Sequence, residues 1–123
     1  MTEFKLIVAG GRDFADYEKL SRVLFTLAEV DYAAKEISIV SGMARGADAL
    51  GTKFAKEHEV NLYEFPANWN KYGKSAGYRR NEEMGNFADG LLAFQCREQP
   101  TPGTAHMIKY MQSLGKPVHI SYY

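Results

Sequence analysis

The sequence has one cysteine, no long apolar run and no excess of either charge, and each shortage excludes a class of protein. Cys96 has no second cysteine to pair with, so we expect no internal disulfide and a reducing, cytoplasmic setting. No stretch reaches the roughly 18–20 apolar residues of a membrane-spanning helix. The first eleven residues carry no basic leader, so we expect no signal peptide.

Charge is balanced, with 15 basic and 15 acidic residues. This balance removes the large electrostatic attraction expected of a nucleic-acid-binding protein. Any anion site must therefore be built from local positive charge and backbone dipoles.

Several familiar site motifs are also missing. The chain contains neither the dinucleotide motif GxGxxG nor the P-loop GxxxxGK[ST]. His58, His106 and His119 lack metal-ligand spacing, and Cys96 has no convincing base nearby in the sequence. We therefore expect no metal, no resident cofactor and no cysteine nucleophile.

Strand-like and helix-like segments alternate along the chain. Short apolar runs predict strands at residues 4–9, 37–40, 60–65, 90–94 and 117–122. Helical spacing predicts helices at about 16–30, 47–58, 76–87 and 104–114. The strands are near-continuous apolar runs, which is typical of parallel sheets covered on both faces. The predicted fold is α/β: one Rossmann-like three-layer domain over residues 1–123, with a five-stranded parallel sheet ordered 3-2-1-4-5.

Two details of the helices test this prediction. Met107, Met111 and Leu114 are expected to face the core from the last helix. Gly51 weakens the second helix by up to ~1 kcal/mol relative to alanine, unless close packing requires it.

Glycine-rich loops follow the first, second and fourth strands: GGRDF (10–14), SGMARGAD (41–48) and QPTPGT (99–104). The carboxyl ends of parallel strands meet at one edge of the sheet, and ligands bind there where the strand order reverses. Helix N-termini leave N–H groups unpaired, and glycines let the backbone approach a ligand closely. The three loops together predict an anion-binding cleft between strands one and four.

The candidate ligand-binding residues lie in or beside these loops. They are Gly10, Gly11, Arg12, Asp13, Ser41, Gly42, Arg45, Gly46, Asp48, Arg80, Asn81, Gly103 and Thr104. Arginine suits phosphate or carboxylate, although Arg79 can instead pair with Glu82 or Glu83 at helical spacing. The two aspartates can hold the arginines or accept ribose hydroxyls, or serve only as turn and helix-start residues.

Trp69, Tyr72 and Tyr78 surround the loop after the third strand. These side chains are base-stacking candidates, and the alternative is a packed aromatic loop with exposed hydroxyls.

The segments GGRDF, SGMARGAD, PANWNKYGKSAGYRRNEEM and GTAHMI together resemble the SLOG superfamily of Rossmann-like proteins. They are most similar to its small single-domain branch of nucleotide-binder-like members. Wider relatives are the Smf/DprA proteins and the LOG phosphoribohydrolases. The resemblance implies a five-stranded parallel core with a pocket for nucleotides or nucleotide-derived ligands.

LOG enzymes hydrolyse the N-glycosidic bond of nucleoside monophosphates with an arginine and a glutamate, and the resemblance carries only half of this pair. Arg80, in RNEEM, matches the arginine, whereas Met107 stands at the glutamate position, next to His106. A thioether can neither act as a base nor stabilise an oxocarbenium-like sugar. Pro102 and Met43 also replace glycines of the related loops. Glu82 or Glu83 is a candidate for a relocated carboxylate.

Three functions remain open, and the leading one is a module that binds a nucleotide-like signal. The alternative is a nucleotide N-glycosidic hydrolase with Arg80 as a catalytic residue. Single-stranded DNA binding, by analogy with DprA, is disfavoured by the neutral charge. We also expect a homo-oligomer, paired through faces that carry residues such as Tyr110 and Met111. Arg80 is expected to be a mostly solvated rim residue.

Overall fold

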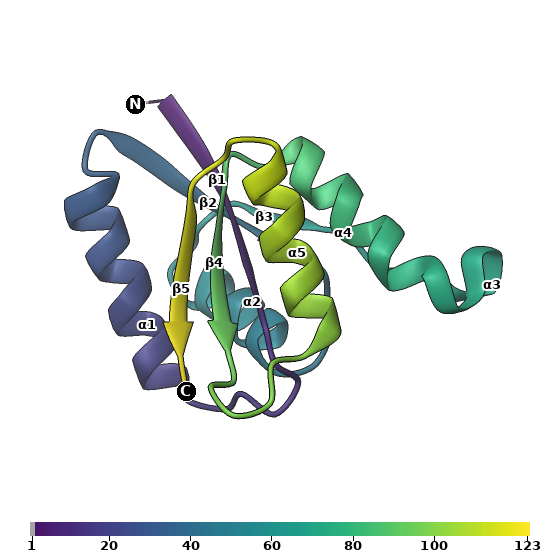
Figure 1. Cartoon of the computed structure of the whole chain (residues 1–123). Helices are drawn as coiled ribbons and strands as arrows, with labels where there is room; N and C mark the ends of the chain where they lie inside the picture. The colour runs from purple at the N-terminus through teal and green to yellow at the C-terminus, as the bar shows by residue number, and fades with distance from the viewer. Residues whose placement is uncertain (1) are drawn as a thin grey trace.

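The computed structural model describes residues 2–123 and contains one five-stranded parallel sheet (Figure 1). Its strands are β1 (Thr2–Gly10), β2 (Lys35–Ser41), β3 (Leu62–Glu64), β4 (Gly90–Gln95) and β5 (Val118–Tyr122). They are ordered β3-β2-β1-β4-β5, and every neighbouring pair is parallel. The predicted fold class and strand order are therefore confirmed.

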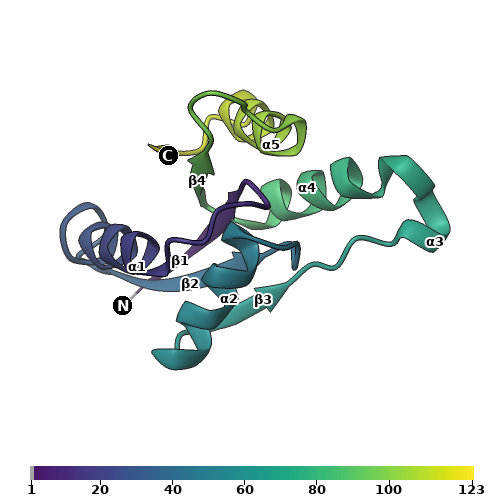
Figure 2. The same ribbon diagram turned by 90° about the horizontal axis from the view of Figure 1, so that it is seen from below.

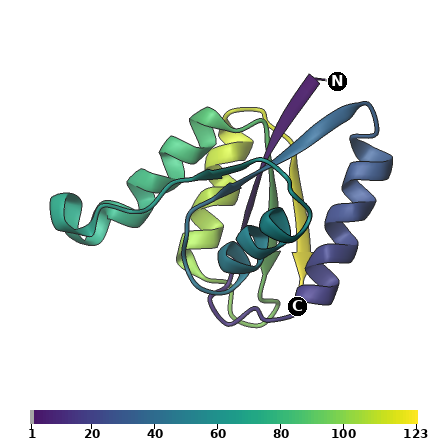
Figure 3. The same cartoon turned by 180° about the vertical axis from the view of Figure 1, so that it is seen from behind.

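Helices cover both faces of the sheet. They are α1 (Tyr17–Thr26), α2 (Ala47–Glu57), α3 (Trp69–Tyr72), α4 (Ala76–Phe87) and α5 (Pro102–Ser113), with a π-helical turn η1 (Leu27–Asp31) and a 3₁₀ turn η2 (Gly73–Ser75). The helices α4 and α5 pack on one face, and α1 and α2 pack on the other (Figures 1 and 3).

The two central strands explain why the layers hold together. Every residue of β4 is buried, and residues 6–9 of β1 are buried as well. Their side chains alternate between the two faces, so Leu6 and Leu92 join the core under α1 and α2 while Ile7 and Leu91 join the core under α4 and α5. Because both faces of these strands are buried, their sequences are near-continuous apolar runs.

Local chemistry sets the helix ends. The Asp16 carboxylate caps α1 by accepting a hydrogen bond from the Lys19 amide at 3.0 Å. At the end of α4, the Lys116 ammonium donates to the carbonyl oxygens of Gly85 and Ala88, each at 2.7 Å. These contacts fix the start of α1, which connects β1 to β2, and the end of α4, which connects β3 to β4.

The Gly51 packing requirement is observed. A Cβ on Gly51 would lie 2.9 Å from the Cβ of Val8 on β1, so α2 approaches the sheet more closely than alanine would allow. The close approach brings the start of α2 against the carboxyl end of β1.

Four local predictions were wrong. The third strand is only three residues long, and the predicted loop 67–75 contains α3 and η2. The last helix begins at Pro102 rather than at residue 104, because proline is favoured at the first helical position. Leu114 follows that helix and is 41% exposed, so it does not face the core.

The segment from α3 to the start of α4 extends away from the sheet as an arm (Figures 1 and 2). Phe65, just after β3, and Phe87, at the end of α4, pack together with ring centroids 5.3 Å apart. Trp69 of the arm and Arg80 of α4 both lie beside the loops that follow β1 and β2. Within residues 2–123, no helix is both long and apolar enough to cross a membrane.

Candidate ligand-binding site

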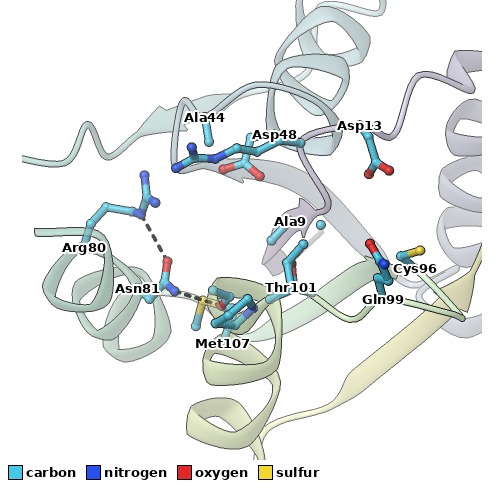
Figure 4. Close-up of a pocket in the computed structure, with 15 residues that line it drawn as sticks. Ala9, Asp13, Ala44, Asp48, Arg80, Asn81, Cys96, Gln99, Thr101 and Met107 are labelled. Carbon is cyan, nitrogen blue, oxygen red and sulfur yellow. Dashed lines mark hydrogen bonds between the residues drawn. The ribbon is translucent and has the colours of Figure 1, made fainter. Parts of the chain in front are cut away.

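A hollow of about 460 Å³ opens at the carboxyl ends of the central strands (Figure 4). We call it the central hollow. Three loops line it, through Gly10, Arg12 and Asp13, through Ala44 and Asp48, and through Gln99, Thr101, Pro102, Gly103 and Thr104. Arg80 and Asn81 of α4 complete its wall, together with Ala9, Cys96 and Met107. The three glycine-rich loops therefore meet on one side of the molecule.

The first two loops are joined through one carbonyl group. The Gly11 oxygen accepts hydrogen bonds from the Phe14 amide at 3.2 Å and from the Ala47 amide at 3.3 Å. Gly46 lies directly against this carbonyl with φ at 77°, and any Cβ there would collide with it. Gly46 is thus needed for the joint between the loops.

Two helices begin at the central hollow. In α5 the N-cap residue Thr101 makes no side-chain cap, since its hydroxyl donates to the Thr104 hydroxyl at 2.8 Å. A Cβ on Gly103 would meet nothing within 4 Å, so the first turn of α5 faces open space. Unpaired first-turn amides carry partial positive charge, and they are donors suited to an anion.

Asp48, in the first turn of α2, is only 5% exposed although it lines the central hollow. Burial raises the pKa of its carboxyl to about 6, while nearby Arg80 and hydrogen bonds from the backbone amides of Ala44 and Gly42 act in the opposite direction. Asp48 therefore organises the second loop through these backbone hydrogen bonds.

Arg80 is partly buried, which corrects the expectation of a mostly solvated side chain. Its guanidinium donates to the Gly42 carbonyl oxygen and, at 3.1 Å, to Asn81 Oδ1. Burial lowers the pKa of Arg80, Asp48 raises it, and Arg12 lowers it again. Because arginine stays protonated in proteins, this group is a fixed positive charge on the wall of the hollow.

Two further hollows adjoin the central one, since Arg12 and Arg80 line all three. The tyrosine hollow, of about 210 Å³, is completed by Trp69, Lys74, Gly77, Tyr78, Asn81 and Gly103. The methionine hollow, of about 310 Å³, is completed by Gly42, Met43, Ala44, Arg45, Pro66, Ala67 and Trp69. The site is therefore a branched cleft with two arginines at the junction.

The cleft is locally positive in a chain of zero net charge. Arg12, Arg45, Lys74 and Arg80 line it, and among residues 2–123 the only carboxyl groups lining it are those of Asp13 and Asp48. The Asp13 carboxylate accepts a 2.6 Å hydrogen bond from the Tyr123 hydroxyl. Local arginines and helix starts supply the attraction for an anion that overall composition does not.

Residues 4–72 match the family described as the YspA, cpYpsA-related SLOG family. The chain belongs to this SLOG family. The matched residues include the first two loops and Trp69, whereas Arg80 and the third loop lie beyond them.

The SLOG chain also resembles a solved structure, the X-ray structure of the structural genomics target TM1055. The TM-score is 0.64 at 18% sequence identity, with 96% of this chain and 72% of that chain covered. At this identity the likeness shows the fold alone. No curated protein matches the chain.

Most candidate residues of the SLOG domain lie in the cleft. Those that line it are Gly10, Arg12, Asp13, Gly42, Arg45, Asp48, Arg80, Asn81, Gly103 and Thr104. Gly11 and Gly46 form the joint described above. Ser41 is fully buried, and its hydroxyl accepts from the Met43 amide at 3.1 Å and from the Thr52 hydroxyl at 3.0 Å. The structure thus places Ser41 beneath the second loop.

Two of the three aromatic candidates for base stacking line the cleft, and the third does not. Trp69 is 51% exposed and lines both side hollows, and Tyr78 lines the tyrosine hollow. Tyr72 lines none of the three hollows; its ring lies 4.5 Å from the Arg79 guanidinium. Arg79 itself donates to Ser75 Oγ at 3.1 Å instead of pairing with Glu82 or Glu83.

Several residues that line the cleft were not among the candidates, including Met43, Lys74, Gln99 and Thr101. Thr101 could have been found, because a threonine before a proline is a helix-start signal. The positions of Lys74 and Met43 depend on the arm and on the backbone of the second loop, for which the sequence carries no simple pattern.

The structure distinguishes between the candidates for a catalytic carboxylate. Glu82 and Glu83 are exposed and line none of the hollows, and Glu82 Oε2 lies 3.7 Å from His106 Nε2. Met107 is buried in the wall of the central hollow. Asp48 is therefore the best-placed buried carboxyl group. Over residues 2–123, no cluster of three histidine, cysteine, aspartate or glutamate side chains could hold a metal ion.

Proposed function

We propose that this SLOG domain binds a nucleotide or a nucleotide-derived small molecule, and that it senses or sequesters this ligand. The phosphate lies in the central hollow, against the first turn of α5 and the guanidinium of Arg12. The observation that carries the proposal is the meeting of an uncapped helix start with Arg12 and Arg80 in one hollow.

Charge and shape support a phosphate in this place. Main-chain amides at a helix start together with arginine are a recurrent anion site. The volume of about 460 Å³ is within the range of small-molecule pockets. The side hollows leave room for a base and sugar, and Trp69 offers a ring for stacking.

Calorimetry tests the proposal with inorganic phosphate, ribose 5-phosphate, AMP, ADP, cyclic nucleotides and ADP-ribose. Arg12→Ala is expected to weaken AMP at least tenfold, because loss of a charge-assisted contact is worth about 1.5–3 kcal/mol. Arg22→Ala is the matched control, since Arg22 is an exposed arginine of α1 that lines none of the hollows. Absence of binding at millimolar ligand, or equal losses in both variants, rejects the proposal.

A second candidate function is hydrolysis of the N-glycosidic bond of a nucleoside monophosphate. The observation favouring it is Asp48, a buried carboxyl with a pKa of about 6 in the central hollow beside Arg80. In this reaction water adds to the sugar carbon, the base leaves with a proton, and ribose 5-phosphate remains. Asp48 as carboxylate stabilises the oxocarbenium-like sugar or accepts the proton of the water.

Chromatography of AMP and NAD after incubation with the protein separates the two functions. The hydrolase predicts free base from the wild type and none from Asp48→Asn, with AMP binding retained. Unchanged AMP recovered from the wild-type protein leaves the binding function and removes the hydrolase.

The proposal also covers the oligomeric state, the cellular location and the partners of the protein. Met111 is fully buried, so, contrary to the expectation from the sequence, it does not contribute to an exposed pairing face. We propose a cytoplasmic homo-oligomer, and sedimentation that shows a strict monomer at micromolar concentration would overturn the oligomer. Nucleic acid is not proposed as a partner because the net charge is zero. A salt-dependent mobility shift with single-stranded DNA would reverse that choice.

A further inference from the structure

The backbone of the second loop is strained at Met43. Its φ is 62°, and among residues 2–123 only Met43 and Glu59 combine a side chain with a positive φ. This left-handed conformation is unfavourable for residues that carry a Cβ, and a residue such as methionine gains nothing locally from it.

Core packing does not account for the methionine. Its side chain is 49% exposed and lies at the methionine hollow, while its amide is held by a hydrogen bond to Ser41 Oγ at 3.1 Å. An exposed apolar side chain on a strained backbone gives the folded domain little stability. Such strain persists where a function needs the side chain.

The methionine hollow has a second apolar wall. Trp69 is 51% exposed and borders the same hollow, with Pro66 and Ala67 between the end of β3 and α3. Arg12 and Arg80 connect this hollow to the central one. A polarisable thioether and an indole therefore border one opening directly beside the arginines.

We propose that Met43 and Trp69 form the subsite for the planar base of the ligand, with Arg12 and Arg80 between the base and the phosphate. This inference rests on the proposed nucleotide binding and assigns the base to one branch of the cleft. Thioether and indole groups both make favourable contacts with flat aromatic rings, and neither requires a particular hydrogen-bond pattern. The subsite therefore selects for a flat ring and discriminates weakly between purines.

The tyrosine hollow is the competing place for the base. It is smaller, at about 210 Å³ against about 310 Å³, and the Tyr78 ring is already packed against His106 with centroids 4.7 Å apart. No strained residue lines it. These features favour the methionine hollow.

The test uses Met43→Gly and the matched control Glu59→Gly, which relieves the same kind of strain at an exposed position outside the cleft. Calorimetry compares AMP with ribose 5-phosphate, which has no base. Met43→Gly is expected to weaken AMP roughly three- to tenfold while ribose 5-phosphate binds as before. Its melting temperature is expected to rise by about 2–4 °C, because the strain is removed. Glu59→Gly is expected to change only the melting temperature.

Two further variants make the outcome decisive. Met43→Ala keeps the strain and loses the thioether, so it is expected to weaken AMP without a gain in melting temperature. Tyr72→Ala removes an aromatic ring that lines none of the three hollows, so it is expected to leave AMP affinity unchanged. If wild type binds both probes and Met43→Gly binds AMP normally, or loses both probes equally, the subsite is rejected. A fall in melting temperature with unchanged AMP affinity makes Met43 a structural residue. If wild type binds neither probe, the proposed function itself fails.

Discussion

The inner strands of the sheet differ from the loops at their carboxyl ends. The strands are buried and unstrained, whereas the second loop and the helix after it contain backbone strain and a buried ionisable group. All six residues of β4 are buried between two helical layers. The second loop, which follows β2, contains a left-handed methionine, and the helix after it carries a buried carboxyl with a pKa of about 6. Stability is concentrated in the sheet, whereas strain and buried charge are concentrated at the loops, which is the usual mark of a functional site.

The largest effect on stability is expected in the sheet. Leu92→Ala, at a residue 1% exposed in β4, should lower the free energy of unfolding by about 3 kcal/mol, because it removes apolar contacts and leaves a cavity. Denaturant titration measures the loss, with the exposed Leu114→Ala as a control expected to change stability by less than about 0.5 kcal/mol. Comparable losses in both variants would contradict the contrast between core and surface.

The next effect concerns Asp48 and depends on pH. Its pKa is raised in the folded state, so the folded protein holds a proton that the unfolded chain releases between about pH 4 and 6. The stability from this proton is lost as pH rises through that window. Asp48→Asn lacks this loss, so its free energy of unfolding should gain about 2 kcal/mol relative to wild type between pH 4 and 7.

Parallel denaturant titrations at pH 4, 5, 6 and 7 follow that difference, with Glu82→Gln as an exposed carboxyl control. A constant difference between Asp48→Asn and wild type across the range would show that burial does not perturb Asp48.

A smaller effect on stability is expected at Arg80. Arg80→Ala should cost about 1–2 kcal/mol, because the Gly42 carbonyl loses its donor and Asp48 loses a nearby positive charge. Arg79→Ala is the matched control on the same helix and should stay within about 0.5 kcal/mol of wild type. If Arg80→Ala is as stable as the wild type, the Arg80 side chain does not contribute to stability and behaves as a solvated residue at the rim of the cleft.

The smallest effect on stability is expected at Arg12, which is exposed and lines all three hollows. Arg12→Ala should change the free energy of unfolding by less than about 0.5 kcal/mol, although the proposed function predicts a large loss of AMP affinity. Thermal melting checks the first part. A marked drop in melting temperature would show that Arg12 has a structural role.

The same contrast explains how far the sequence could predict this protein. Apolar runs and helical spacing predicted all five strands and the order of the sheet, because burial on two faces leaves a continuous signal. The loops 10–14, 41–48 and 99–104 followed from that order. The shortness of β3 and the presence of α3 and η2 were not predicted, since short elements carry too few residues for a period to show.

Individual roles at the loops were harder to predict than their location. Ser41 and Thr104 look alike in sequence and both are buried, yet Ser41 lies beneath its loop while Thr104 lines the central hollow. At Met43 the sequence indicates only a departure from a glycine-rich form, whereas the structure shows a positive φ. Backbone conformation and burial decide these roles, and neither is encoded by residue type alone.

The central claim is that the first turn of α5 and Arg12 hold the phosphate of a nucleotide. Titration of AMP into isotope-labelled protein, followed by amide NMR, tests it most directly. The account predicts that the Gly103 and Thr104 amides shift strongly, with Arg12 among the next most affected, while amides of α1 stay in place. Saturating shifts confined to residues away from the central hollow would contradict it.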